Sequence, residues 1–239
     1  MSAFFDYPKS AAFGRVVPKN KIYEHAGANT ALKDLFVREV DQINWRYKLA
    51  PETINLNATA SVPEIQVFSI SLKTGKLDET VLRAIDKAIP FPLVFELTWR
   101  GKRKAAAAFK RQSEADSAKW VVSEYFATDW VPEETGRMPL PVALDLGALY
   151  DRLLTAIMPA EMGTPGQGDE DIQARVDRME AIRAKTREVE RIKTRLTREK
   201  QYNKRVAINA ELRKANQELA ELQQSGVRRT DSQLTGTNI

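Results

Sequence analysis

Cysteine is absent from this sequence of 239 residues, and histidine occurs only once. Without cysteine there are no disulfide bonds, thiolate zinc sites or cysteine nucleophiles. A histidine-based zinc centre or a Ser-His-Asp triad would have to use His25, and no Gly-x-Ser-x-Gly motif accompanies it. We therefore interpret His25 as a hydrogen-bonded loop residue. We single out no catalytic residue, metal ligand or cofactor.

Long hydrophobic runs are also missing. No stretch approaches the roughly 18 apolar residues of a membrane span, and the N-terminus lacks the apolar core of a signal peptide. We expect a cytoplasmic protein without membrane contact. The phosphate-binding motif Gly-x-x-x-x-Gly-Lys-Ser/Thr is absent as well, which argues against ATP hydrolysis by this chain.

The most distinctive feature that is present is a basic C-terminal segment. Residues 1–168 contain 21 Lys and Arg and 20 Asp and Glu, whereas residues 172–229 contain 16 and 8. Between them, MGTPGQGDED has the composition of a flexible break. We therefore divide the chain as follows: an α/β domain over 1–160, a flexible linker over 161–171, a long basic helix or coiled coil over 172–224, and a disordered tail over 225–239.

Hydrophobic spacing predicts the first long element of the α/β domain. Asn29 can cap a helix, and apolar positions that include Phe36, Val40 and Ile43 follow at intervals of three and four residues. Proline interrupts a helix because it lacks the backbone N–H and clashes with the preceding turn. We therefore expect one helix from Asn29 to just before Pro51.

Alternating hydrophobic and polar residues predict the sheet. Strands are expected over 64–73, 93–99 and 120–130, with a hairpin turn at Arg-Gly-Lys and a further strand after it. Helices are expected after the capping residues Asp78 and Asp145. The resulting fold class is α+β: a mostly antiparallel sheet of about four strands with helices, followed by a long C-terminal helix or helical hairpin of coiled-coil type.

The C-terminal segment contains two apolar stripes at helical spacing. No proline or glycine occurs from Asp169 to about Gln224, which predicts roughly 53 helical residues. The polar sequence TREKQYNKR separates the stripes, so either the helix folds back near Asn203 or the stripes meet different partners. The stripe residues predicted to bind a partner are Val189, Ile192, Leu196, Leu212 and Leu219.

Opposite the first stripe runs a row of arginines, which we call the arginine ladder: Arg183, Arg187, Arg191, Arg195 and Arg198. Residues 183–205 contain ten basic and three acidic residues. Arginines four residues apart repel each other on a helix, so the pattern costs some stability unless anions lie along it. Nucleic-acid phosphates are one source of such anions. The alternative interpretation is the solvated face of a coiled coil.

Three glutamates suggest a rival hypothesis. Glu64, Glu96 and Glu124 each lie in an expected strand, and three convergent carboxylates could hold the magnesium ion of a nuclease. Against this, the Glu-x-Lys spacing of the common restriction-nuclease core is absent. Glu96 also lies on the strand face opposite Phe95, where a solvated glutamate is expected.

Four stretches carry a family resemblance: RVVPKNKIYEHA, FVREVDQINWRYKLAPETINL, LDETVLRAIDKAIPFPLVFEL and EKQYNKRVAINAELRKANQEL. In these the chain resembles a bacterial family of unknown function encoded beside a DNA methyltransferase and a DEAD/DEAH-box helicase. The resemblance implies a restriction-modification or phage-defence setting, with a helicase or DNA methyltransferase subunit as partner. It supplies no catalytic residues.

The leading hypothesis is a non-enzymatic accessory subunit of such a system. It would dock on its protein partner and contact the backbone of a nucleic acid such as DNA through the arginine ladder. The first alternative is a metal-dependent nuclease of the same system. The second is a structural homodimer formed through the C-terminal helix without nucleic acid. The sequence leaves the choice between DNA and RNA open.

Overall fold

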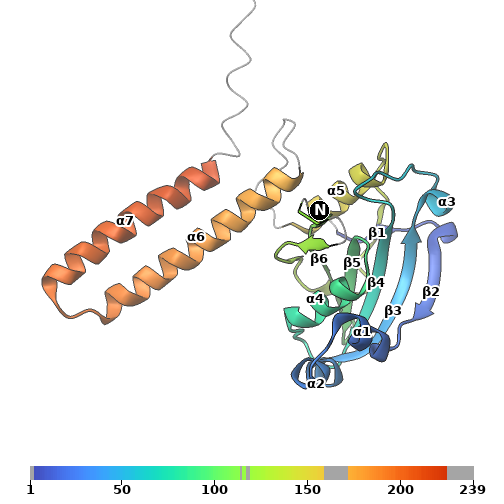
Figure 1. Cartoon of the computed structure of the whole chain (residues 1–239), viewed down its shortest axis with the longest axis horizontal. Helices are drawn as coiled ribbons and strands as arrows, with labels where there is room; N and C mark the ends of the chain where they lie inside the picture. The colour runs from blue at the N-terminus through green and yellow to red at the C-terminus, as the bar shows by residue number, and fades with distance from the viewer. Residues whose placement is uncertain (1–2, 114, 117–118, 159–171, 225–239) are drawn as a thin grey trace, which may run out of the picture. The chain divides into compact units, whose positions relative to one another are not determined.

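The computed structural model describes residues 3–113, 115–116, 119–158 and 172–224. The chain divides into two compact units, Met1–Pro159 and Ala160–Ile239. The described residues of the first unit form an α+β domain, and those of the second form a helical hairpin (Figure 1). None of the described helices is long and apolar enough to cross a membrane.

The α+β domain is built on a mixed, mostly antiparallel sheet. Its strand order is β10-β6-β5-β4-β3-β2, with β9 also paired to β6, and only the β4–β5 pair is parallel. This confirms the predicted fold class, with seven strands among the described residues where about four were expected. The strands are β2 (Ala12–Val16), β3 (Val40–Leu49), β4 (Ile65–Leu72), β5 (Leu93–Trp99), β6 (Lys102–Ala107), β9 (Phe126–Ala127) and β10 (Val131–Pro132).

Two small strand pairs lie outside this sheet. The strands β1 (Phe5–Asp6) and β11 (Met138–Pro139) pair in parallel, and β7 (Lys110–Gln112) pairs antiparallel with β8 (Trp120–Val122). Short helical turns occur at η1 (Lys9–Ala11) and α3 (Pro51–Ile54).

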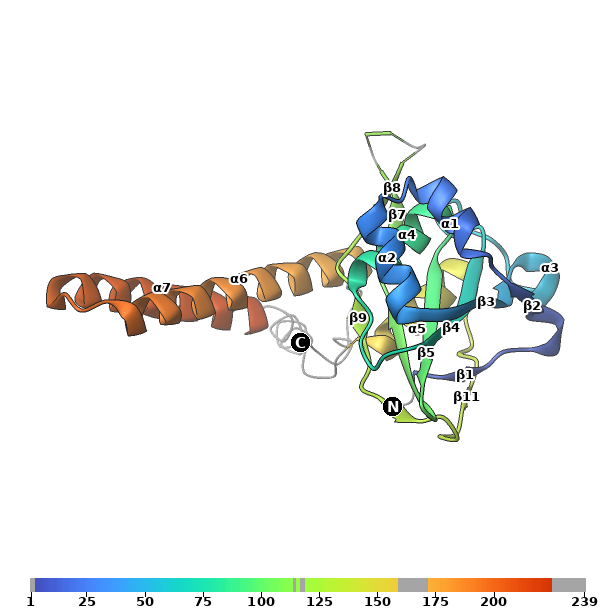
Figure 2. The same cartoon turned by 90° about the horizontal axis from the view of Figure 1, so that it is seen from below.

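Helices cover both faces of the sheet. The helices α1 (Lys19–Ala26), α2 (Thr30–Glu39) and α4 (Glu79–Ala88) lie on one face, and α5 (Leu146–Ile157) lies on the other (Figure 2). The parallel pair β4–β5 requires a crossover, which α4 provides. The central strands are therefore enclosed by helices on both sides.

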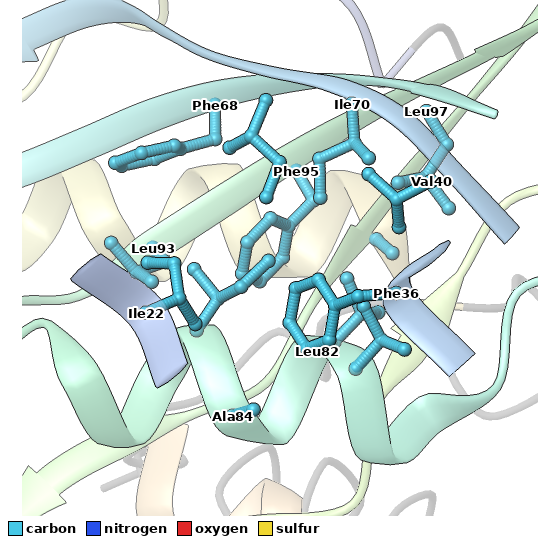
Figure 3. Close-up of a cluster of buried hydrophobic side chains, with 14 of the residues drawn as sticks. Ile22, Phe36, Val40, Phe68, Ile70, Leu82, Ala84, Leu93, Phe95 and Leu97 are labelled. Carbon is cyan, nitrogen blue, oxygen red and sulfur yellow. The ribbon is translucent and has the colours of Figure 1, made fainter. Parts of the chain in front are cut away.

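The main hydrophobic core lies between the sheet and helices α1, α2 and α4. Phe68 from β4 and Phe95 and Leu97 from β5 pack with Phe36 of α2 and Leu82 of α4 (Figure 3). All five side chains are at most 5% exposed. The alternation predicted for 93–99 thus points Phe95 and Leu97 into this core, as expected for a strand packed against a helix.

The expected helix from Asn29 to Pro51 is wrong in its second half. Asn29 does cap α2, because its side chain accepts a hydrogen bond from the Leu32 N–H. The helix ends at Glu39, however, and Val40–Leu49 form the strand β3. Irregularities in the β3–β4 register between Val40 and Gln42 and between Trp45 and Tyr47 shift the side-chain alternation. Those shifts give a strand the apolar spacing of a helix.

Two smaller predictions also need correction. The expected strand 120–130 is divided into β8 and β9, which pair with different strands, β7 and β6. Residues 123–125 separate them, and the Ser123 backbone and hydroxyl bond to the Phe109 backbone instead of extending the main sheet. His25, expected in a loop, is an exposed residue in the last turn of α1.

The second unit is a hairpin of two long helices. α6 (Ile172–Arg198) and α7 (Tyr202–Gln224) are joined by the three residues 199–201 and pack side by side (Figure 1). Of the two arrangements left open by the sequence, the fold-back is therefore the one adopted. The linker predicted over 161–171 and the tail predicted over 225–239 lie outside the described residues.

Candidate nucleic-acid interface

The apolar stripes of the hairpin pack on each other. Val189 and Ile192 of α6 and Ile208 and Ala215 of α7 are buried, at 3–7% exposure, and partly buried leucines flank them. The seam formed in this way includes every residue predicted to bind a partner: Val189, Ile192, Leu196, Leu212 and Leu219. The hairpin itself buries Val189 and Ile192, whereas Leu196, Leu212 and Leu219 stay partly exposed at the edges of the seam.

Ion pairs between the helices fix their register. Lys185 Nζ lies 2.7 Å from a Glu218 carboxylate oxygen on α7 and 2.8 Å from one of Glu188 on α6. Hydrogen bonds to Glu188 and Glu218 raise the Lys185 pKa. Arg195 forms a two-pronged pair with Glu211 of α7, at 3.1 and 3.2 Å. This fork uses both carboxylate oxygens, so it fixes direction as well as distance.

The arginine ladder lies on the outside of the hairpin. Arg187, Arg191, Arg195 and Arg198 are exposed, while Val189 and Ile192 between them are buried. A helix repeats every 3.6 residues, so this pattern places Arg187, Arg191 and Arg198 opposite the seam, whereas Arg195 lies close enough to α7 to pair with Glu211. The geometry leaves the ladder accessible to a large ligand.

The five ladder arginines are not equivalent, however. Arg183 is only partly exposed, and Arg183 and Arg187 each already take part in another interaction. Arg191 donates from Nε to the Arg187 carbonyl oxygen at 3.3 Å, and Arg195 is held by its carboxylate partner on α7. Arg198, at the end of α6, forms no salt bridge within the described hairpin.

Positive charge is concentrated where the chain turns back. We call residues 198–206 the hairpin tip; its charged residues are Arg198, Glu199, Lys200, Lys204 and Arg205. Glu199, the one acidic residue among them, accepts a hydrogen bond from the Gln201 N–H at 2.8 Å. Hydrogen bonds from the backbone, chiefly this one, lower the Glu199 pKa. The Glu199 carboxylate is thus occupied by the backbone of the turn between α6 and α7.

Helix dipoles separate the cations of the tip into two groups. A cation near a helix C-terminus is typically favourable by about 0.3–1 kcal/mol, and one near an N-terminus is unfavourable to a similar extent. Arg198 lies in the last turn of α6, so local structure accounts for it. Lys204 and Arg205 lie in the first turn of α7, which contains no acidic residue. Local structure disfavours these two cations.

The tip also exposes apolar surface. Tyr202, the first residue of α7, is 79% exposed, and Val206, one turn later, is 53% exposed. Neither belongs to the buried seam. Lys200, Lys204 and Arg205 next to them form no salt bridge in the part of the hairpin that the structure describes. An exposed ring therefore lies among cations that have no carboxylate partner there.

Glu96 occupies a different environment from the one expected. We predicted a solvated glutamate, but Glu96 is 6% exposed and pairs with Arg137 through two contacts of 2.8 and 2.6 Å. Arg137 also donates to the Phe5 carbonyl oxygen at 2.9 Å. The outer face of β5 is covered, so its one carboxylate requires a paired cation, which the partly exposed Arg137 supplies. The pair ties the N-terminal segment and the β11 region to the sheet.

The three glutamates of the nuclease hypothesis do not form one site. Glu64 lies 3.3 Å from Lys48 Nζ, at the start of β4. Glu96 is in register with Ser69, five residues further along β4, which corresponds to about 17 Å. Glu124 lies between β8 and β9. In the described ranges, no three His, Asp or Glu side chains gather closely enough to hold a metal ion.

A buried polar cluster went unrecognised in the sequence. Lys110 Nζ donates to the carbonyl oxygens of Asp86, at 2.5 Å, and of Ile89, and lies 3.4 Å from Asp86 Oδ1. The Tyr125 hydroxyl donates to Asp86 Oδ2, and the Tyr150 hydroxyl accepts from the Lys110 N–H at 3.1 Å. Burial raises the pKa of Asp86 and Tyr125 and lowers that of Lys110.

This cluster has a structural role, since Asp86 and Lys110 are only 4% and 1% exposed and no substrate can reach them. It joins the C-terminal end of α4 to β7 and to the segment that precedes β9. One weak indication was present in the sequence: Lys110 lies two residues after four consecutive alanines, Ala105–Ala108, all of which are buried.

An α+β domain joined to a basic helical hairpin defines the class of this protein. The profile of the family described as "Domain of unknown function (DUF4391)" matches residues 5–219, so the chain belongs to this family. The match extends through both units, and the hairpin is therefore part of what the family shares. Comparisons with curated proteins and with solved structures returned no match.

Proposed function

We propose that this protein is a non-enzymatic accessory subunit of a DNA methyltransferase and helicase system, and that its hairpin binds the nucleic-acid backbone. The α+β domain would dock on the helicase or methyltransferase, in keeping with the sequence resemblance described above. The observation that supports backbone binding is the exposed basic face of α6 and the unpaired cations of the tip. Such a surface supplies affinity without sequence specificity.

The dimensions of the ladder suit a nucleic-acid backbone. Arg183 and Arg198 are 15 residues apart on one helix, or about 22 Å, which is the rise of about six to seven base pairs. The seam residues of α6 and α7 pack on each other, so a ligand of the hairpin would bind its exposed faces. An extended polyanion can contact several ladder residues at once.

Neither alternative has a comparable observation behind it. The nuclease hypothesis requires three convergent carboxylates, and Glu64, Glu96 and Glu124 lie apart. The homodimer hypothesis requires an unpartnered apolar stripe, and the seam residues of α6 and α7 from Val189 to Leu219 pack on each other. We therefore propose only the accessory subunit.

The test neutralises three exposed ladder residues, Arg187, Arg191 and Arg198, by substitution with Gln. Glutamine keeps helix propensity nearly constant, so circular dichroism should not change. Binding of the full chain to a labelled duplex is measured by fluorescence anisotropy over a salt series. We expect the slope of log K against log salt to decrease by about 0.9 for each phosphate that the protein no longer neutralises.

The matched control changes the same number of charges elsewhere. Lys9, Lys76 and Lys102 are exposed lysines of the α+β domain, and their triple substitution with Gln should leave the slope unchanged. An equal decrease of slope in both triple variants would show that only net charge matters. Failure of the wild type to bind duplex or single strands at about 50 mM salt would refute the proposed function.

A further inference from the structure

The hairpin tip has two features that the proposed backbone contact does not require. The first is the Tyr202 ring, which is 79% exposed. The second is the continuation of that apolar surface onto Val206, four residues later and therefore on the same side of α7. Both side chains lie outside the seam, so packing of the hairpin does not explain them.

The charges around Tyr202 favour an anion. Lys200 precedes the ring in the turn, and Lys204 and Arg205 follow it in the first turn of α7. The first backbone N–H groups of that helix have no intrahelical partner and add positive potential at the same place. The acidic side chain of the tip, Glu199, already accepts from the turn backbone.

We propose that the hairpin tip binds single-stranded nucleic acid, with an unpaired base stacked on Tyr202 and its flanking phosphates held by Lys200, Lys204 and Arg205. Stacking on an aromatic ring within a basic surface is how proteins bind single strands without sequence preference. Arg205 is three residues from Tyr202, which places a cation beside the ring. This inference rests on the proposed function, because the same hairpin carries the ladder.

The geometry favours a single strand over the other large anions. Bases of a duplex are already stacked on each other, so a ring at a helix end has no base face to meet except at a terminus or an unpaired segment. A membrane-bound helix needs an apolar face along its length. On α7, the exposed apolar surface at the tip is limited to Tyr202 and Val206, and polar residues such as Asn209 and Arg213 follow.

The test compares three probes and three proteins. The probes are a blunt duplex, the same duplex with a single-stranded overhang, and an oligothymidine of about 12 nucleotides, within the usual site size of such surfaces. The proteins are the full wild-type chain, Tyr202→Ala and Tyr202→Phe. The phenylalanine variant is the matched control because it keeps the stacking ring and loses only the hydroxyl. Circular dichroism verifies that all three fold alike.

We expect Tyr202→Ala to weaken binding of the overhang and of oligothymidine by about 5- to 150-fold, the range measured when one stacked base loses its aromatic partner. Binding of the blunt duplex should change less than about twofold, because the ladder contacts remain. Tyr202→Phe should bind all probes like the wild type. A 2-aminopurine base in the overhang should change its fluorescence with the wild type and Tyr202→Phe, and not with Tyr202→Ala.

The outcomes distinguish this inference from the function it rests on. If the wild type binds the duplex with a ladder-dependent salt slope and Tyr202→Ala retains full affinity for the overhang, the tip inference is wrong and the proposed function stands. If the wild type binds none of the probes, both fail. A separate binding assay with anionic phosphatidylserine vesicles covers the remaining case. If Tyr202→Ala loses vesicle binding and keeps its affinity for all three nucleic-acid probes, the tip binds a membrane surface, which also overturns the inference.

Discussion

Replacing Lys110 with Met tests the buried polar cluster of the α+β domain. The ammonium group of Lys110 donates to the Asp86 and Ile89 carbonyl oxygens and lies 3.4 Å from the Asp86 carboxylate. Methionine has a similar length and fills the same space, so the substitution removes the charge with little change in packing. Asp86 then keeps only the Tyr125 hydroxyl as a partner among the cluster's side chains.

The expected cost is large because a buried carboxylate loses its cation. Removing one partner of a buried ion pair destabilises a protein by about 3–5 kcal/mol. This is a substantial share of a total free energy of unfolding of about 5–15 kcal/mol. With a urea dependence of about 2 kcal/mol per molar, the midpoint of unfolding should fall by about 2 M.

The cost should also depend on pH. Burial raises the Asp86 pKa in the folded protein, and the positive charge of Lys110 opposes that rise. In the Lys110→Met variant the opposing charge is gone, so the pKa rises further. A raised carboxyl pKa stabilises the folded state at low pH, and this stabilisation is lost as the pH rises through the folded-state pKa. The loss in free energy of unfolding of Lys110→Met relative to the wild type should therefore be smaller in acid than at neutral pH.

Tryptophan fluorescence isolates the domain that is perturbed. Trp45, Trp99, Trp120 and Trp130 all lie in the first unit, so the hairpin does not contribute to the signal. Lys102→Met, an exposed lysine on β6, is the control and should change stability by less than about 0.5 kcal/mol. Asp86→Asn combined with Lys110→Met should recover part of the stability. A Lys110→Met variant as stable as the control, or a deficit independent of pH, would refute this reasoning.

Two further predictions concern the hairpin and the glycines. Ile192→Asp places a charge in the seam and should lower helicity by circular dichroism without moving the tryptophan transition, whereas Thr194→Asp on the exposed face should have little effect. Gly75→Ala brings a Cβ to 3.0 Å from the Trp99 ring, and Gly101→Ala strains a residue at φ +70. We expect each to cost about 1–3 kcal/mol in urea unfolding, whereas Gly136→Ala, with open space around it, should be tolerated.

The features predicted well from the sequence are those that depend on residues close together in the chain. Asn29, Asp78 and Asp145 each cap a helix as predicted, with side-chain oxygens accepting from backbone N–H groups at 2.8–2.9 Å. Capping depends on residues within one turn, so a short window contains the needed information. The fold-back of the C-terminal segment was predictable as one of two arrangements for the same reason, since the polar interruption is local.

Contacts between distant segments were not predictable in this way. The burial of Glu96 depends on Arg137, which is 41 residues away, and on cover over the outer face of the strand. The strand β3 resembled a helix because its register shifts arise from pairing with β4. In both cases the deciding interaction joins residues that are too far apart in the sequence to belong to one hydrophobic pattern. The alternating pattern therefore predicted the strand containing Glu96 and the wrong environment for its carboxylate.

The candidate interface depends both on a local sequence pattern and on contacts between distant segments. The arginine ladder is a local pattern and was found as such, but the fold-back alone shows that Arg195 is held by Glu211, 16 residues later. The fold-back also places the last turn of α6 beside the first turn of α7, where the two dipoles act oppositely on cations. The dipole of α6 favours the positive charge of Arg198 at its C-terminus, whereas the dipole of α7 disfavours the positive charges of Lys204 and Arg205 at its N-terminus. A bound phosphate offsets this unfavourable interaction with the helix dipole. Lys204 and Arg205, whose positions helix stability does not explain, are therefore the cations that a phosphate stabilises most.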